Sequence, residues 1–496
     1  MGIRGILSKP LAHFLSAGNK SWIDHPEAAQ EKVFKTLIET AKATEFGRRH
    51  SFETIRTYED FKKNVPVREY EGIKAYVDLI LEGRQNILWP GKPLYLAKTS
   101  GTTSGSKYIP ITKESIPNHI NSTRNALMDY IVETGKSQFL DKKLIFLSGS
   151  PVLAKKAGIH IGRLSGIVNH HVPAVLRSNQ LPSYETNCME DWESKVDKIV
   201  EETYLQDMSL ISGIPSWVQM YFEKLKQKSG GKSIHEIFPN FSLFIYGGVN
   251  YEPYRTKFEH YIGRKVDSIE LFPASEGFFA YQNQQDDKAL LLMANSGIFY
   301  EFIPADEYFS ENPTRLNLSQ VKTGINYALV ISSNAGLWSY SIGDMVRFTS
   351  IKPYKLIVAG RIKHYTSAFG EHVIAEEVED AMQIALSLYG GEVNEFHVAP
   401  MVNPTEGLPY HEWLVEFGSK PSDLEGFSKM LDETLQTKNT YYKDLIQGKV
   451  LKPLVVTIVK DGSFISYMKS EGKLGGQNKL PRLANDRKMA DQIRIQ

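Results

Sequence analysis

Residues 98–112 read KTSGTTSGSKYIPIT and combine the residue types that suit binding of an anion. Glycines such as Gly101 and Gly105 let successive backbone N–H groups turn into one concavity, hydroxyl side chains add donors, and Lys107 adds a positive charge. This composition predicts a polyphosphate-binding loop. The hydroxyl-bearing residues of the loop are Thr99, Ser100, Thr102, Thr103, Ser104 and Ser106.

The loop differs from the P-loop of nucleoside triphosphatases. A P-loop places its glycines one residue further apart than Gly101 and Gly105, and it has Ser or Thr after its lysine, where this chain has Tyr108. A flexible Ser/Gly linker is the other interpretation. Because the loop lies between apolar strand-like segments and not between domains, we favour anion binding.

Three further segments carry residues that suit a nucleotide or a cation, and each also has a simpler explanation. IYGG ends in Gly247 and Gly248, which could mark only a tight turn. LFPASEGF contains Phe272 and Glu276, which could be a core residue and a surface charge. YSIGDMVRF contains Asp344 after a glycine, a pair that is common in turns.

Two C-terminal segments add cationic candidates. GRIKHYTSAFGEHV contains Arg361 and Lys363, and MKSEGKLGGQNKLPRL contains Lys473 and Lys479. The last two lysines could instead merely solvate a mobile tail. The five segments follow the loop at residues 98–112 in this order along the chain.

This order resembles that of the adenylate-forming enzymes, the superfamily that includes firefly luciferase. The SGTTSG core and QNKLPR are similar in particular to the Gretchen Hagen, or auxin-responsive, acyl-acid amido synthetases. The resemblance spans nearly the whole chain, including FLSAGNKSWIDHPEAAQ and ISGIPSWVQMYFEKL.

The resemblance implies a nucleotide site. Phe272 stands where the family usually has Tyr, so the ring could stack on adenine without a phenol hydrogen bond, while Ser275 contacts the α-phosphate. Glu276 binds Mg²⁺, an ion that prefers hard oxygen ligands, and Asp344 accepts hydrogen bonds from the ribose. The implied nucleotide-binding residues are Ser100, Gly101, Thr102, Thr103, Ser104, Lys107, Gly247, Gly248, Val249, Phe272, Ser275, Tyr340, Asp344 and Arg361.

Adenylate-forming enzymes also use a lysine whose charge stabilises the reacting carboxylate and α-phosphate. Lys473 follows a glycine in the general superfamily manner. Lys479 lies in QNKLPR, which resembles Gln-Tyr-Lys-x-Pro-Arg of the amido synthetases with Asn478 in place of Tyr. We therefore predict that Lys479 and Glu276 are catalytic. Lys363 occupies a hinge position at which relatives often have Asp.

The family's acid-binding side chains vary, so the acid pocket must be sought in the sequence itself. GIHIGRLSGIVNHHVP is the candidate wall. Arg163 could pair with a substrate carboxylate and His170 or His171 could act as a base. These three residues could equally be polar surface residues beside a turn.

The implied activity is ATP-dependent ligation of an acid to an amine. A small carboxylic acid would form an acyl adenylate and pyrophosphate with MgATP, and an amino acid would then displace AMP to give an amide. Positioning and charge neutralisation are enough for such chemistry. The alternatives are a thioester-forming ligase that uses coenzyme A, and a catalytically silent nucleotide-binding protein.

The elements that would position these residues follow an α/β order. Strand-like LYLA, KLIFLSG, LSLISG and LFIYGG alternate with helical segments, including residues 115–134 and PSWVQMYFEKLKQ. Residues 27–44 form another predicted amphipathic helix, and YEDFKKNVPV is a short helix that ends at Pro66. LLLMANSGIFYEFIP, INYALVISS and VRFTS predict an antiparallel meander.

After Gly360 the sequence predicts a compact α+β unit. EEVEDAMQIALSLY and LEGFSKMLDETLQ are expected helices, and FHVAP, HEWLVEF, LVVTIVK and FISYM are expected strands. The resemblance implies an α/β large domain over residues 1–361, with sheets flanked by helices and a small β-barrel. A smaller, mobile α+β domain would cover residues 362–496.

Composition limits the partners. The chain has 496 residues, with 58 Lys and Arg against 57 Asp and Glu, so no global field favours nucleic acid or an anionic membrane. Its single cysteine, Cys188, excludes an intrachain disulfide and favours the cytoplasm. The N-terminal apolar stretch is interrupted by Lys9, Pro10 and His13, so we expect no anchor, and no obligate protein partner is evident.

Overall fold

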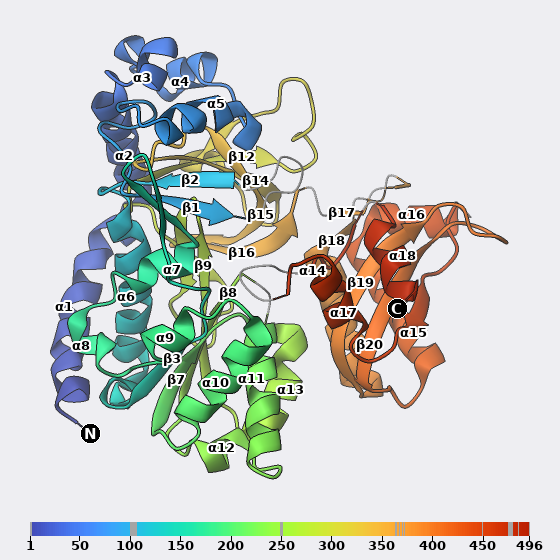
Figure 1. Ribbon diagram of the computed structural model, residues 1–496. Coiled ribbons are helices and arrows are strands. Elements are labelled where there is room, and N and C mark those ends of the chain that lie inside the picture. The colour runs from blue at the N-terminus through green and yellow to red at the C-terminus, as the bar shows by residue number, and fades with distance from the viewer. Residues whose placement is uncertain are drawn as a thin grey trace. The chain divides into compact units, whose positions relative to one another are not determined.

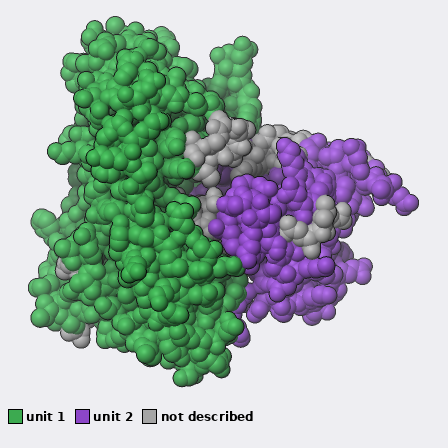
Figure 2. Space-filling model, viewed as in Figure 1, with its two compact units in different colours: residues 1–249, 262–357 green, residues 250–261, 358–496 purple. Residues whose placement is uncertain are grey.

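The computed structural model describes residues 2–99, 107–248, 251–362, 365–366, 368–369, 371, 373–448, 450–474, 480–484 and 486–495. Contacts divide the chain into two compact units, coloured separately in Figure 2. The large unit contains residues 1–249 and 262–357, and the small unit contains residues 250–261 and 358–496. The boundary of a mobile domain at residues 361 and 362 stays a prediction.

One sheet of twelve strands dominates the large unit, in the order β13-β12-β14-β15-β16-β11-β10-β9-β8-β7-β3-β6 (Figure 1). Its parallel half contains three of the apolar runs predicted as strands, at residues 143–149, 208–213 and 243–248, and most of their residues are buried, as expected for strands covered on both faces. These strands are β3 (Lys143–Phe146), β6 (Gln180–Leu181), β7 (Met208–Ser212), β8 (Leu243–Gly247) and β9 (Asp267–Ala274).

The antiparallel half confirms the predicted meander. Its strands are hydrogen-bonded into the same sheet as the parallel ones. They are β10 (Gly277–Gln282), β11 (Leu290–Leu292), β12 (Ile298–Pro304), β13 (Leu316–Asn317), β14 (Asn326–Ser333), β15 (Tyr340–Ile351) and β16 (Tyr354–Arg361), with the short 3₁₀ helix η3 (Leu318–Gln320).

A second sheet has the order β2-β1-β5-β4. Its strands are β1 (Tyr95–Thr99), β2 (Lys107–Ile111), β4 (Ala154–Lys156) and β5 (Ile159–Gly162). Helix α6 (Ile116–Thr134) follows β2, close to the predicted bounds. The helices between the later strands are η2 (Gln138–Asp141), α7 (Leu164–Asn169), α8 (Ala174–Arg177), α9 (Tyr184–Asn187), α10 (Trp192–Thr203), α11 (Pro215–Lys228), α12 (Ile234–Ile237) and α13 (Glu252–Ile262).

Helices open the chain. The predicted amphipathic helix is α2 (Pro26–Ala41), which buries Leu37, Ile38 and Ala41. It follows α1 (Ile3–Asp24), a continuous helix through Pro10 that packs beside α6 (Figure 1). The remaining elements here are α3 (Glu45–Arg49), η1 (Phe52–Thr54), α4 (Tyr58–Asn64), which ends before Pro66 as predicted, and α5 (Tyr70–Leu81).

The small unit is α+β, as predicted. Its main sheet has the order β19-β20-β21, with β19 (Glu392–Met401), β20 (Tyr410–Ser419) and β21 (Val455–Ile458). A two-stranded sheet joins β17 (Tyr365–Thr366) and β18 (Val373–Ile374). The helices are α14 (Ala375–Tyr389), α15 (Leu424–Lys438), α16 (Thr440–Gln447), α17 (Ser463–Ser470) and α18 (Lys488–Ile495), together with α13 up to Tyr261.

The strand predicted at FISYM is wrong, because these residues form α17. Phe464 is buried, Tyr467 and Met468 are half-buried, and Ile465 is exposed. Apolar contacts at spacings of three and four residues suit a helix face, whereas a strand would bury alternate residues. The short apolar run concealed this spacing.

We predict that the buried imidazole of His119 makes the fold sensitive to acid. His119 is 5% exposed, and burial lowers its pKa from 6.5 to about 4. The unfolded chain therefore binds this proton first, and stability falls as the pH drops from 6.5 towards 4, by at most about 3 kcal/mol. Urea unfolding of His119→Gln across this range should show a weaker pH dependence than the wild type. The exposed control His13→Gln should keep the wild-type slope, and an unchanged slope in His119→Gln would refute the assignment.

Candidate functional site

The predicted phosphate loop joins the two strands of a hairpin. β1 and β2 pair antiparallel, with Thr99 opposite Lys107. The ends of the loop are thereby fixed across one strand pair, with Lys107 half-buried. The loop candidates Ser100, Gly101, Thr102, Thr103 and Ser104 lie outside the described residues.

Helix α5 supports this hairpin through its first residue. The Tyr108 N–H donates to the hydroxyl of Tyr70 at 3.0 Å, and the Lys107 ammonium lies 5.7 Å from the centroid of the Tyr70 ring. Just before α5, the Arg68 N–H donates to the Ser339 carbonyl at 3.0 Å, and the Ser341 N–H donates to the Arg68 carbonyl at 2.9 Å. The segment that starts α5 therefore joins the hairpin to the beginning of β15.

The carboxyl ends of β8 and β9 bring two other predicted segments together. Gly247 faces Leu271 in this parallel pair, and a Cβ at position 247 would lie 2.5 Å from the Leu271 carbonyl oxygen. Gly248 has a φ of 80°, which favours glycine. Both glycines thus have backbone reasons for their identity, and an approach of adenine to them stays a prediction. Val249 lies outside the described residues.

The turn between β9 and β10 carries Ser275 and Glu276. Ser275 is buried and Glu276 half-buried. Their turn is held by Asn118 of α6, whose Oδ1 accepts from the Phe278 N–H at 2.7 Å and whose Nδ2 donates to the Phe278 carbonyl at 2.9 Å. Because α6 directly follows the hairpin, it links the phosphate-loop candidates to the candidate metal ligand.

Phe272 packs as a core residue. Its side chain is 5% exposed, and its ring lies edge-on to Phe279 with centroids 5.1 Å apart. This packing agrees with the alternative explanation that Phe272 is a core residue. Stacking of the ring on adenine stays a prediction.

Tyr340 and Asp344 lie near the start of β15. Tyr340 is 2% exposed and Asp344 is half-buried. The pairing with β14 shifts register between the pairs Ala328–Met345 and Val330–Ser341, and Gly343 has a φ of 84°. The glycine and aspartate therefore belong to a bulged strand and not to a turn, so the turn interpretation is wrong. Bulges of this kind redirect a side chain.

The remaining predicted contacts belong to the small unit. Arg361 is the last residue of β16 and is exposed. Lys473 is exposed and lies 3.2 Å from a carboxylate oxygen of Glu471. Lys363 and Lys479 lie outside the described residues.

The segment just after Lys479 is fixed by Arg482, which is 8% exposed. Its guanidinium pairs with Glu379 at 3.2 Å and with Glu395, and donates to the Tyr254 hydroxyl at 3.0 Å. The Val398 N–H also donates to the Arg482 carbonyl at 2.8 Å. The arginine of QNKLPR is therefore a buried anchor that joins β19, α14 and α13.

The candidate acid wall lies around α7. Arg163 is the N-cap residue of this helix and is exposed. His170 Nε2 donates to the Pro151 carbonyl at 2.8 Å, which gives this exposed ring a structural role. His171 Nε2 lies 3.0 Å from the Tyr95 hydroxyl of β1, and burial, with His170 nearby, lowers its pKa. His171 is thus neutral near pH 7 and beside the hairpin.

A buried lysine in the same region was not predicted. Lys195 is 1% exposed and its ammonium donates to the Ser148 and Asn187 carbonyls at 2.9 and 2.7 Å. Burial lowers its pKa to about 8. It joins the end of β3 to the turn after α9, where Cys188 is half-buried. Nothing in the sequence pattern of α10 indicated that Lys195 would be buried.

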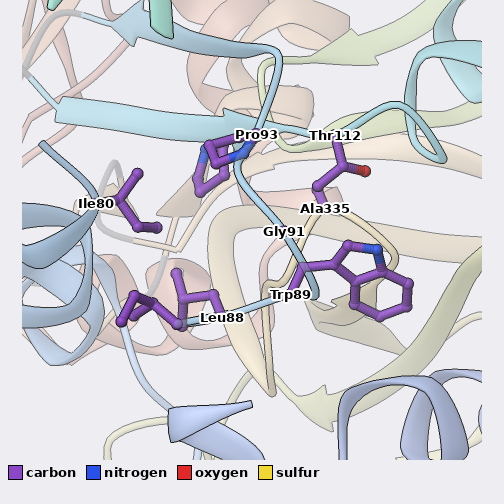
Figure 3. Close-up of a pocket in the computed structure, with 9 residues that line it drawn as sticks. Ile80, Leu88, Trp89, Gly91, Pro93, Thr112 and Ala335 are labelled. Atoms are coloured by element: carbon purple, nitrogen blue, oxygen red, sulfur yellow. The ribbon is translucent and has the colours of Figure 1, made fainter. Parts of the chain in front are cut away.

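A small, mostly apolar cavity of the large unit lies elsewhere (Figure 3). Pro93 and Pro110 line it, at the end of the hairpin opposite to Thr99 and Lys107. Four residues of strand, about 13 Å, separate the two ends. None of the predicted nucleotide-binding residues in the described part of the chain lines the cavity. The other lining residues are Ile80, Ile87, Leu88, Trp89, Gly91, Thr112 and Ala335.

Glu276 fits a Mg²⁺ ion that the phosphate oxygens of a nucleotide would bind as well. Among the residues that the structure describes, no group of three or more His, Cys, Asp or Glu could enclose a metal. A single carboxylate suits Mg²⁺, which keeps several waters and binds phosphate oxygens.

Models of three family domains match the chain in order. The GH3 family N-terminal domain matches residues 20–194 and 152–266, the central domain residues 291–361, and the C-terminal domain residues 376–488. The chain belongs to the GH3 family. This confirms the resemblance seen in the sequence.

Relatives with assigned names support the same family. Indole-3-acetic acid-amido synthetase GH3.3 of Arabidopsis thaliana is 22% identical over 91% of this chain and 88% of its own length. Jasmonoyl--L-amino acid synthetase JAR4 of Nicotiana attenuata is 23% identical over 64% of this chain and 66% of its own length.

Solved structures of two enzymes share this fold. GH3.15 acyl acid amido synthetase superposes with a TM-score of 0.79 at 17% identity, over 96% of this chain and 95% of that one. The 2-hydroxyisobutyryl-CoA ligase gives 0.61 at 14% identity, over 95% and 92%. The predicted α/β fold class is therefore confirmed. No helix within the described ranges is both long and apolar enough to cross a membrane.

Three residues of this GH3 chain that anchor candidate segments were not predicted from the sequence. Tyr70, Asn118 and Arg482 each act through partners far away in the sequence. Only Arg482 could have been singled out from the sequence, because it is the last residue of the QNKLPR motif. Asn118 had no signal beyond its place in the first turn of a predicted helix.

We predict that Asn118→Ala destabilises the turn that carries Glu276. The change leaves the buried N–H and carbonyl of Phe278 without their side-chain partner, which costs about 2–4 kcal/mol of unfolding free energy. Hydrogen exchange should report faster exchange at the Phe278 amide. Asn121→Ala, a matched change on the same helix, should cost less than about 1 kcal/mol. Equal exchange in the two variants would show that Asn118 does not hold the turn.

Proposed function

We propose that this chain is an ATP-dependent acyl-acid amido synthetase. A small carboxylic acid attacks the α-phosphate of ATP to form an acyl adenylate and release pyrophosphate. The amine of an amino acid then attacks the activated carbonyl, which forms an amide and releases AMP. The observation that carries the proposal is the match of all three GH3 family domains, in order, between residues 20 and 488.

The placement of the candidate residues in the large unit supports a nucleotide site. Gly247 ends β8 opposite Leu271 of the parallel neighbour β9, and β9 continues to Ala274, just before the turn that bears Ser275 and Glu276. Lys107 belongs to the hairpin that Tyr70 supports. Carboxyl ends of adjacent parallel strands are the usual place for ligands in such sheets.

A second group of contacts supports the same site. The backbone pairing of Arg68 with residues 339 and 341 joins the hairpin side to the start of β15. Asp344 stands in the bulge of that strand, and we propose that it binds the ribose. The loop residues 100–104 would supply phosphate contacts, and Tyr340, Phe272 and Val249 would surround the base.

Glu276 would hold Mg²⁺, which neutralises phosphate charge during attack at the α-phosphate. Arg361 and the catalytic lysine belong to the C-terminal part of the chain. We propose that residues 362–496 move between the two half-reactions about a hinge near Lys363, so that one site serves both steps. Lys479 would bring its charge to the reacting carboxylate and phosphate.

The acid is proposed to bind beside α7. Neutral His171 next to Tyr95 suits a base better than His170, whose Nε2 is engaged by a main-chain carbonyl. Arg163 is exposed at the start of the helix and could meet a carboxylate. The indole-3-acetic acid and jasmonoyl names of the relatives make aryl, indolyl and alkyl acids the first candidates.

Product analysis tests the proposed reaction directly. We expect pyrophosphate release and an amide of matching mass when the protein is incubated with MgATP, a panel of such acids and the twenty amino acids. Coenzyme A replaces the amino acids in a parallel series, because a CoA ligase shares the fold. A thioester would replace the proposal by the alternative ligase. Nucleotide binding without pyrophosphate for any acid would indicate a silent protein.

We predict that Lys479→Ala lowers pyrophosphate release by on the order of 100-fold or more, because a preorganised charge at the reacting centre is lost. Lys473→Ala is the matched control and should retain activity, since its ammonium lies beside Glu471 on the surface. Rates of the acid-dependent exchange of pyrophosphate into ATP measure this step alone. Loss of exchange in Lys473→Ala only would reverse the assignment.

A further inference from the structure

The outer face of α1 carries large apolar side chains that the fold leaves exposed. Ile3 is 76% exposed, Leu7 65% and Phe14 75%. Spacings of three, four and seven residues place them on one side of the helix. We call this set the α1 stripe: Ile3, Ile6, Leu7, Leu11 and Phe14.

No exposed apolar stripe stands out in the sequence of this segment. Lys9, Pro10 and His13 interrupt the apolar run only along the chain. On a continuous helix the apolar residues come together. Five large exposed apolar side chains on one face of a helix are a candidate interaction surface.

The opposite face of α1 is fixed to the large unit. Gly5, Ala12 and Trp22 are buried, and α1 runs beside α6 (Figure 1). The first turn is pinned by Asp141, whose carboxylate accepts from the Gly2 N–H at 2.6 Å and from the Gly5 N–H at 3.0 Å. The helix therefore presents the stripe outwards as a fixed surface.

Positive charges flank the α1 stripe. Lys9 and Lys20 are eleven residues apart and so lie in one row along the helix, and half-buried Arg4, which donates to the Ser178 hydroxyl at 2.9 Å, lies on the other side of the stripe. The sequence contains no Asp or Glu before Asp24. This local charge is hidden in the net charge of +1 for the whole chain.

A second copy of the chain fits this surface poorly. Residues 3–14 span about 17 Å of helix that is about 10 Å wide, or roughly 170 Å². A stable interface needs about 800 Å² from each partner. Pairing two such helices would also bring rows of like charge together.

We propose that α1 binds the surface of an anionic lipid bilayer. The helix lies in the plane of the membrane, with the α1 stripe among the upper acyl chains and Arg4, Lys9 and Lys20 beside the headgroup phosphates. An amphipathic helix with this combination of apolar and basic residues binds in this way without crossing the bilayer. The surface is independent of the proposed ligase reaction.

Flotation with lipid vesicles tests the proposal on the full chain. The wild type should float with vesicles of phosphatidylcholine and phosphatidylserine, less with phosphatidylcholine alone, and less as salt is raised. The triple variant Ile3→Ser, Leu7→Ser, Phe14→Ser should lose binding by on the order of tenfold or more. The control Leu205→Ser, Phe309→Ser changes side chains that are 88% and 60% exposed outside α1, and should float like the wild type.

Two results would overturn the proposal. One is a wild type that stays in solution with anionic vesicles. The other is a triple variant that floats as well as the wild type while its circular dichroism is unchanged. If the wild type does not float but sediments as a dimer that the triple variant dissolves, a second copy is the true partner of the stripe.

Discussion

The parallel pairing of β8 with β9 determines where the other parts of the candidate site can be. Gly247 lies so close to the Leu271 carbonyl that no side chain fits there, which fixes the end of β8 against the middle of β9. The chain must then turn away at Gly248, with a positive φ, while β9 continues to the turn that bears Ser275 and Glu276. Two segments that are far apart in the sequence thus meet at one edge of the sheet. Ligands of open α/β sheets usually bind outside the carboxyl ends of parallel strands, which is where these segments lie.

The other corners of the large unit are tied to this edge through single side chains. Asn118 satisfies both backbone groups of Phe278, and Tyr70 accepts from the backbone of the hairpin. Asn118 and Tyr70 both form hydrogen bonds with backbone groups, so the loops can differ in sequence while their ends remain in place. This arrangement separates the groups that touch a substrate from the groups that position them. It is consistent with the low identity between this chain and relatives that have the same fold.

Much of the fold could be read from local patterns. Apolar runs bounded by glycines predicted β3, β7 and β8, and period-3.6 patterning predicted α2 and α14, because these signals act within one element. The bulge at Gly343 and the burial of Phe272 depend on neighbouring strands and could not be read locally. FISYM failed because five apolar-rich residues do not distinguish the two periods. The anchoring roles of Asn118 and Arg482 could not be predicted, because their partners come from other parts of the chain. The α1 stripe could not be predicted either, because Lys9, Pro10 and His13 interrupt the apolar run along the sequence.

The surroundings of Arg482 bear on where the small folding unit begins. The Arg482 guanidinium pairs with both Glu379 and Glu395, and the Tyr254 hydroxyl accepts from this guanidinium and donates to Glu395. Lys257, on the same helix as Tyr254, donates to Asn394 at 2.6 Å. A fragment expressed from residue 362 onwards would lack both side chains and expose part of β19 and α14. The small unit is therefore built from two separate stretches of the sequence. Dividing the chain at one point near residue 362 would separate residues 250–261 from the sheet and helices against which they pack.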